Sequence, residues 1–148
     1  MTKTGADLRV KASNQGARHK ARRTAVQALY QWDITEQSAD DIRDHFIETE
    51  GSKGVDTAYL AILIAEVPQH CKELEKALEP YLDRAVSALD PIERAILRIG
   101  SYELIYQPDV PPKVVINEAI ELAKVFGADH SFRYVNGVLD KLAAASRR

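Results

Sequence analysis

The densest group of side chains that could bind a ligand is a basic cluster near the N-terminus, formed by Arg18, His19, Lys20, Arg22 and Arg23. The cluster runs without a break into a segment with helical periodicity. Cations at the first turn of a helix face the positive end of the macrodipole, which costs roughly 0.3–1 kcal/mol for each. Helix stability therefore does not explain the cluster, which instead predicts a site for an anionic partner, with a polyphosphate such as nucleic acid as the first candidate.

The distribution of charge along the chain supports this interpretation. The first 23 of the 148 residues carry seven of the 20 Lys and Arg residues and a single acid, Asp7, so this arm has a net charge of +6. The other 125 residues carry 13 bases and 21 acids, a net charge of −8. The overall charge of −2 thus hides a basic arm on an acidic body. We expect the arm to bind the polyanion and the body to stay free for protein partners.

Spacing within the cluster suggests how it would bind. Arg18 and Arg22 are four residues apart, so a helix places them on one face, with Lys20 and Arg23 beside it. Such a face can contact several phosphates, and an Arg side chain can also stack on a base or bind it through two hydrogen bonds. The alternative is a charge run that is merely solvated, which is the usual role of a generic Lys and Arg cluster. The opposition to the helix dipole and the contrast with the acidic body favour binding.

A second candidate site lies at the start of the last expected helix, where Arg133 and Tyr134 stand next to each other. The inward stripe of this helix contains Phe132, Val135 and Leu139, so Arg133 and Tyr134 fall toward its edge. An exposed aromatic side chain beside an Arg can stack an unpaired base, a contact worth roughly 1–3 kcal/mol. The alternative is a half-buried Tyr134 at the rim of the core, with its hydroxyl in water. The pattern alone supports both equally.

Helical periodicity runs through nearly all of the remaining chain and positions these residues. We expect a flexible tail over residues 1–17, followed by one domain over residues 18–148. The apolar spacing predicts seven helices, over residues 18–34, 39–50, 56–67, 69–82, 91–106, 112–126 and from 131 onward. No segment alternates as a strand does, so the fold class is an all-α bundle.

The fifth expected helix has the clearest start signal. Asp90 is placed as the N-cap, Pro91 in the first helical position and Glu93 in the third. The helix is apolar over most of its circumference, which predicts a central position among its neighbours. Gly100, in its middle, is expected to allow the close approach of another helix.

Several functional classes are excluded or disfavoured by what the chain lacks. No apolar stretch reaches the roughly 18 residues that span a membrane, and no secretory signal is present, so we expect a soluble cytoplasmic protein. A phosphate-binding loop of the nucleotide-hydrolysing type is absent, and the four His residues are not paired at metal-ligand spacing. We therefore expect neither an enzyme nor a bound metal or cofactor.

Four segments together resemble the bacterial NusB family of transcription antitermination factors. They are residues 21–30 (ARRTAVQALY), 93–104 (ERAILRIGSYEL), 115–124 (VINEAIELAK) and 134–141 (YVNGVLDK). The likeness covers roughly residues 18–142 in the expected order. It implies a seven-helix bundle made of two three-helix subdomains plus a basic N-terminal helix.

The resemblance also implies a function. Members of this family bind the single-stranded boxA segment of nascent ribosomal RNA leaders together with the ribosomal small-subunit protein NusE. The complex, with other antitermination factors, keeps RNA polymerase processive. Carried over by position, the arginine-rich motif falls on Arg18, His19, Lys20 and Arg22.

Two further positions follow from the same resemblance. The aromatic position implicated in RNA contact falls on Tyr134, with Arg133 beside it, and Glu93 is our choice for the NusE-binding surface. His19 replaces a base that is common in the motif, which weakens its charge at neutral pH. Tyr134 stands where Phe is frequent, and this exchange should preserve stacking.

Two other functions are compatible with the bundle. NusB-like domains also resemble the N-terminal region of certain ribosomal RNA cytosine methyltransferases, so the chain could be a substrate-recognition fragment. No methyl-donor-binding α/β domain follows Arg148, which favours the adaptor. The other possibility is a pure protein-interaction bundle with a solvated arm, which an RNA titration would separate from the adaptor.

Overall fold

The computed structural model describes the backbone of residues 5–147 and the side chains of residues 15–147. Two short 3-10 helices, η1 (Glu79–Tyr81) and η2 (Val86–Ala88), join the fourth and fifth α-helices. The seven α-helices of this part of the chain are α1 (Gly5–Ile34), α2 (Ala39–Glu50), α3 (Thr57–Gln69), α4 (Cys71–Leu78), α5 (Pro91–Tyr106), α6 (Pro112–Phe126) and α7 (Ser131–Ser146). No strand occurs between residues 5 and 147, so the predicted all-α, seven-helix fold is confirmed.

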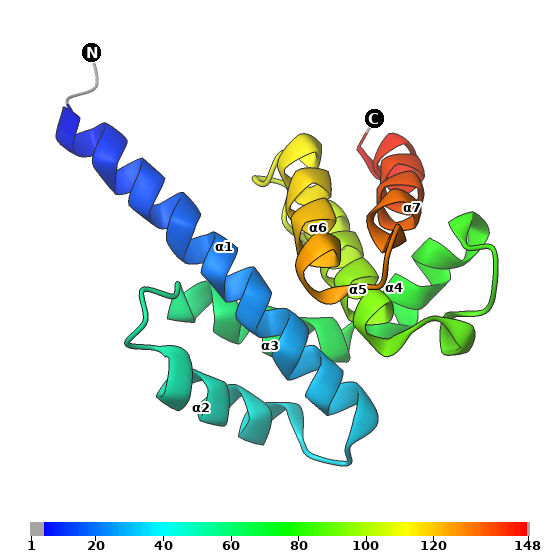
Figure 1. Ribbon diagram of the computed structural model, residues 1–148, viewed down its shortest axis with the longest axis horizontal. Helices are drawn as coiled ribbons and strands as arrows, with labels where there is room; N and C mark the ends of the chain where they lie inside the picture. The colour runs from blue at the N-terminus through cyan, green and yellow to red at the C-terminus, as the bar shows by residue number, and fades with distance from the viewer. Residues whose placement is uncertain (1–4, 148) are drawn as a thin grey trace.

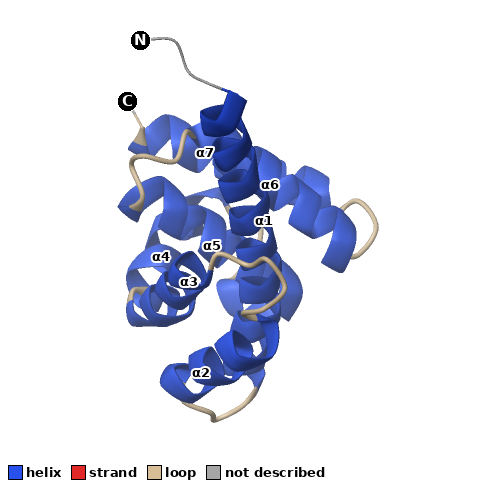
Figure 2. Ribbon diagram, turned by 90° about the vertical axis from the view of Figure 1, so that its left-hand side faces the viewer, coloured by secondary structure: helices blue, strands red, loops and turns tan. Residues whose placement is uncertain are grey.

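The helices form two packed groups joined by α1. In the first group α1 packs against α2 and α3, and in the second α5, α6 and α7 pack against one another with α4 on α5. Because α1 also contacts α5 and α6, it belongs to the interface between the groups. Figures 1 and 2 show the first turns of α1 extending beyond the other helices. No helix in the described range is long and apolar enough to cross a membrane.

Helix α1 begins earlier than the sequence pattern predicts. It starts at Gly5 rather than near Arg18, so the described part of the expected tail, residues 5–17, has a helical backbone. Residues 6–15 contain no Pro or Gly, and adding a residue to a helix that is already nucleated costs far less than starting one. An apolar stripe is therefore unnecessary for this extension. Mobility of residues 1–17 in solution stays a prediction, and residues 1–4 lie outside the described range.

The ends of the other helices follow local signals. Ser38, Asp56 and Asp90 cap α2, α3 and α5 by accepting hydrogen bonds from backbone N–H groups of the first turn. The predicted start of α5 is thus confirmed. The expected fourth helix is shorter, because α4 ends at Leu78 and Pro80, which has no N–H to donate, lies in the 3-10 turn that follows.

Helix α5 is the central element, as its apolar circumference predicts. All residues from Ala95 to Leu104 are buried. Gly100 allows α7 to approach closely, because a Cβ atom placed there would lie 2.6 Å from Cδ1 of Leu139, which is itself fully buried. The expected role of Gly100 in close packing is confirmed.

This packing gives a stability prediction. Gly100→Ala should destabilise the fold by about 1–3 kcal/mol, because the added Cβ would lie 2.6 Å from Cδ1 of the fully buried Leu139, which would have to shift within the core. Gly137→Ala is the matched control: nothing lies within 4 Å of the added Cβ in the middle of α7, so it should stabilise by about 0.5–1 kcal/mol. Urea unfolding measures both. An equal effect of the two substitutions would contradict the close approach at Gly100.

Candidate nucleic-acid interface

A buried ion pair fixes the basic part of α1 to the rest of the bundle. Arg22 is 3% exposed, and its guanidinium donates to the Glu103 carboxylate from Nε at 3.0 Å and from Nη2 at 2.8 Å. Tyr59 of α3 donates its hydroxyl to the same carboxylate. The three residues therefore join α1, α3 and α5 at one point.

Electrostatics at this point favour the charged pair. Burial alone lowers the pKa of Arg22, but the hydrogen bond and the negative charge of Glu103 outweigh it and raise the pKa overall. Burial and the charge of Glu103 also raise the pKa of Tyr59, which keeps its hydroxyl protonated and able to donate. The carboxylate is thus matched by one cation and one neutral donor.

Arg22 consequently differs from the exposed phosphate contact that the sequence predicts. The spacing placed Arg18 and Arg22 on one face of α1, and they do share it. That face, however, lies against α3 and α5, so the side chain of Arg22 is enclosed while that of Arg18, one turn nearer the N-terminus, is 44% exposed. Arg22 orients the basic helix and is not a freely accessible cation.

The other bases of the cluster remain near the surface. Arg18 lies with its guanidinium carbon 4.2 Å from the centre of the Tyr59 ring and 3.8 Å, from Nε, to the Asp56 carboxylate. Lys20 is exposed and donates to the carbonyl of Lys53 at 3.2 Å, and Arg23 is exposed beside it. These three cations line the outside of α1.

His19 is placed between the two groups of helices. Its Nδ1 atom lies 2.6 Å from the Glu118 carboxylate of α6, and Nη1 of Arg22 lies 3.9 Å from the same carboxylate. Glu121 pairs with Lys124 within α6, at 3.8 Å, whereas Glu118 faces α1. This contact could not be read from periodicity within α6 alone.

The second candidate site is built at the start of α7. Arg133 is exposed, and Tyr134 is half-buried with its hydroxyl accepting a hydrogen bond from the backbone N–H of Asp83 at 3.1 Å. The guanidinium carbon of Arg84 lies 5.6 Å from the centre of the Tyr134 ring. Tyr134 therefore has the rim position that was one of the two predicted alternatives, but its hydroxyl contacts backbone, and its ring lies beside Arg84.

Phe132 is an aromatic side chain that the pattern assigned only to the core. It packs against the core but is partly exposed, with Lys124 Nζ 5.2 Å and the Arg133 guanidinium carbon 5.7 Å from the centre of its ring. An aromatic ring with two cations at its side is suited to stack a base near phosphate-binding groups. The signal available in the sequence was the adjacency of Phe132 and Arg133.

Glu93, the predicted partner-binding residue, lies close to this second site. It is half-buried in the first turn of α5, and its carboxylate accepts a hydrogen bond from the Ser131 hydroxyl at 2.6 Å. Ser131 is the first residue of α7, so Glu93 ties the start of α5 to the start of α7. Arg133 and Tyr134 follow Ser131 by two and three residues in the first turn of α7. The contact with Ser131 therefore places Glu93 next to the second candidate site.

Helix α6 connects the two candidate sites. Glu118 contacts the basic part of α1, and Lys124, six residues or about 9 Å further along the helix axis, contacts Phe132. Arg18 and Lys20 contact α3 and the loop before it, whereas Tyr134 contacts the segment after α4. The structure therefore keeps the sites apart but places one helix between them. Among the described residues, no three His, Cys, Asp or Glu side chains are grouped to hold a metal ion.

Most of the chain matches a known protein family. The model of the NusB family matches residues 19–144. The chain belongs to the NusB family. The match begins at His19, so the whole helical extension of α1, residues 5–17, precedes the part of the chain that the NusB family model covers.

Individual NusB relatives are similar over most of their length. The chain is 53% identical over 131 residues to the transcription antitermination protein NusB of Pasteurella multocida, covering 88% of this chain and 91% of the relative. It is 52% identical over 130 residues to the protein of the same name from Nitrosococcus oceani, covering 88% and 87%.

Solved NusB structures share the fold. A structure of NusB from T. maritima superposes with a TM-score of 0.77 at 28% identity, covering 85% of this chain and 89% of that one. A crystal structure of the antitermination factors NusB and NusE in complex with double-stranded RNA superposes with a TM-score of 0.78 at 28% identity, covering 86% and 96%.

The buried ion pair gives a second stability prediction. Arg22→Ala should destabilise the fold by about 3–5 kcal/mol, because it leaves the Glu103 carboxylate buried without its cation. Arg23→Ala, the neighbouring exposed base, should change the free energy of unfolding by no more than about 0.5 kcal/mol. Denaturant unfolding followed by circular dichroism measures both. A loss below about 1 kcal/mol for Arg22→Ala would show that the pair does not hold α1 in place.

Proposed function

We propose that this protein is a non-enzymatic RNA-binding adaptor in transcription antitermination. In this role it binds the single-stranded boxA segment of nascent ribosomal RNA leaders together with the ribosomal small-subunit protein NusE, in the cytoplasm, and so helps to keep RNA polymerase processive. The observation that carries the proposal is the presentation of Arg18, Lys20 and Arg23 on a helix that Arg22 and Glu103 anchor from inside. The names of its relatives and the known NusB–NusE–RNA complex support it.

Phosphate neutralisation is the role of the exposed bases of α1. Arg18, Lys20 and Arg23 can each reach a phosphate, and the stacking of Arg18 on Tyr59 limits the conformations that it must give up on binding. Arg22 contributes by holding the helix, and His19 by its contact with Glu118. Because α1 begins at Gly5, these bases lie inside the helix, and the helix-start cost expected from the sequence does not apply to them.

Base stacking is the role of the start of α7. Tyr134 is held by Asp83 and flanked by Arg84, and Arg133 lies beside Phe132. A strand bound along the basic face of α1 would pass Lys124 of α6 on its way to this site. The RNA in the known NusB–NusE complex is a duplex. The support for a single strand in this protein comes instead from its partly exposed aromatic rings, because a base inside a duplex cannot stack on them.

Protein docking is assigned to the acidic body. Glu93 is proposed to contact NusE at the junction of α5 and α7, next to the stacking site, so that RNA and protein partner would bind side by side. RNA polymerase and the other antitermination factors would be reached indirectly through this complex. This arrangement predicts that NusE increases the affinity for RNA.

The whole proposal would be contradicted if the protein, with NusE present, bound boxA no better than a scrambled single strand or a duplex.

The phosphate contacts predict a specific change in salt dependence. Replacing Arg18, Lys20 and Arg23 together with Ala should reduce the slope of log affinity against log salt by about 2, because each single-strand phosphate contact contributes about 0.7. A triple variant of exposed bases elsewhere, Lys72, Lys76 and Lys141, is the matched control and should leave the slope nearly unchanged. Fluorescence anisotropy titrations of labelled boxA at several salt concentrations measure it. Equal slopes for the two triple variants would refute the assignment of phosphate binding to α1.

The stacking role of Tyr134 predicts a different signature. Tyr134→Ala should weaken RNA binding about tenfold with little change in the salt slope, because it removes a ring and no charge. Tyr134→Phe retains the ring and loses only the hydrogen bond from Asp83, so it should bind nearly as well as the unchanged protein. A reduced slope for Tyr134→Ala, or an equal loss in both variants, would argue against stacking.

A further inference from the structure

A hollow with a volume of about 430 Å³ lies between α1 and the start of α6. Residues 15–22 of α1 form one side, and residues 109–118 form the other. Its volume falls in the lower part of the range of small-molecule sites, about 300–1,000 Å³. The hollow adjoins the exposed face of Arg18 but lies apart from Tyr134, so the stacking site at α7 does not account for it.

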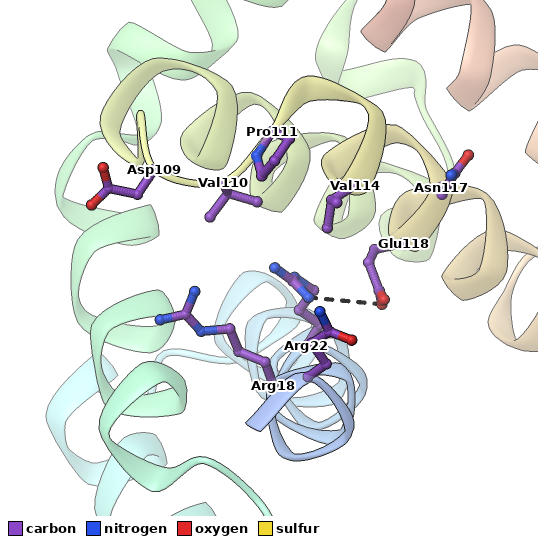
Figure 3. A pocket seen from close by; sticks show the side chains of 9 residues that line it. Arg18, Arg22, Asp109, Val110, Pro111, Val114, Asn117 and Glu118 are labelled. Carbon is purple, nitrogen blue, oxygen red and sulfur yellow. Dashed lines mark ion pairs between the residues drawn. The ribbon is translucent and has the colours of Figure 1, made fainter. Parts of the chain in front are cut away.

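The two walls of the hollow differ in chemistry. Val110, Pro111 and Val114 form an apolar wall, and Figure 3 shows them opposite Arg18 and Arg22. Val114 is 40% exposed, so the apolar wall is accessible from solvent. A flat ring placed between the walls would contact apolar atoms on one face and a guanidinium plane on the other. Nucleobases stack on both kinds of surface.

The polar groups at the edge of the hollow are suited to a base rather than to a phosphate. Asn117 can donate and accept hydrogen bonds, and the Glu118 carboxylate can accept them. Asp109 and Glu118 offset the positive charges of Arg18 and Arg22, so the lining has no net positive charge that would favour a phosphate inside. A carboxylate acceptor favours a base that presents an exocyclic amino group.

The hollow is formed before any ligand binds. Its far wall is held by Arg147, which donates to the carbonyl groups of Val110 at 3.0 Å, Gln107 at 3.0 Å and Leu104 at 2.7 Å. Its floor is held by the ion pair of Arg22 with Glu103. Little ordering is therefore required when a ring enters, which favours binding.

We propose that this hollow receives one unstacked nucleobase, bearing an exocyclic amino group, from the strand whose phosphates lie along α1. The inference rests on the proposed RNA-binding function and adds a base-reading site to it. The base enters between Val114 and the guanidinium of Arg18, with its edge toward Asn117 and Glu118. Its phosphates stay outside, within reach of the exposed cations of α1. The site would supply base preference, which the phosphate contacts cannot supply.

A scan with abasic nucleotides tests the proposal. BoxA single strands carrying one abasic position at a time are titrated against the full-length protein. An abasic site at one position, or at either of two adjacent positions, should weaken binding about tenfold, because the hollow then lacks its base. Val114→Trp fills the hollow and should abolish this penalty at that position while leaving the penalty due to Tyr134 in place. Val125→Trp, on another exposed valine of the same helix outside the hollow, is the matched control and should keep the profile of the unchanged protein.

The identity of the base provides a second readout, independent of the Trp substitution. At the sensitive position, cytosine should bind roughly fivefold or more tightly than uracil, and Asn117→Ala should reduce that preference without altering the salt slope. A profile unchanged by Val114→Trp, or uracil binding as well as cytosine in the unchanged protein, would overturn the proposal. If Val114→Trp removes the abasic penalty equally on boxA and on a scrambled strand, the hollow binds a base but the protein does not select boxA. Failure of the base-reading proposal can thus be told apart from failure of the proposed function.

Discussion

The contact of Arg22 with the Glu103 carboxylate is the interaction on which the rest of the structure depends. Glu103 lies in the most buried stretch of the central helix, where an unpaired carboxylate would be strongly destabilising. Arg22 and Tyr59 satisfy it from α1 and α3, so one buried charge joins the two groups of helices. The same contact sets the rotation of α1 about its axis. That rotation decides which bases of the cluster face the solvent.

The orientation of α1 divides one cluster of charges into two roles. Arg22 faces inward and His19 faces Glu118, while Arg18, Lys20 and Arg23 remain near the surface. Because α6 contacts α1 through Glu118 and α7 through Phe132, the proposed base-reading and stacking sites lie along one helix, whereas Lys20 lies at the loop before α3. A single strand that contacts all three sites would have to cross α1. Specific binding would come from bases held at two places and affinity from the phosphates between them.

Much of the candidate site can be predicted from residue types along the sequence. The rest depends on which residue each side chain contacts in the fold. The basic cluster, the central helix and the close packing at Gly100 are visible in the sequence, because they depend on local charge and periodicity. The burial of Arg22 and the contact of Glu118 with His19 depend on residues 81 and 99 positions away. One signal was available for Glu103: an acid within the apolar stretch of a central helix requires a cationic partner. The sequence could not say which Arg that partner would be.

The sequence by itself determined the all-α class, most helix boundaries, the basic character of α1 and the family resemblance, because each is a property of neighbouring residues. Only the tertiary structure decided which bases are accessible and that Glu93 lies beside the start of α7. It also decided that a hollow with one apolar and one cationic wall lies between α1 and α6. The physical reason is that exposure and shape arise where helices meet, and a helix repeat of 3.6 residues defines faces without defining what covers them.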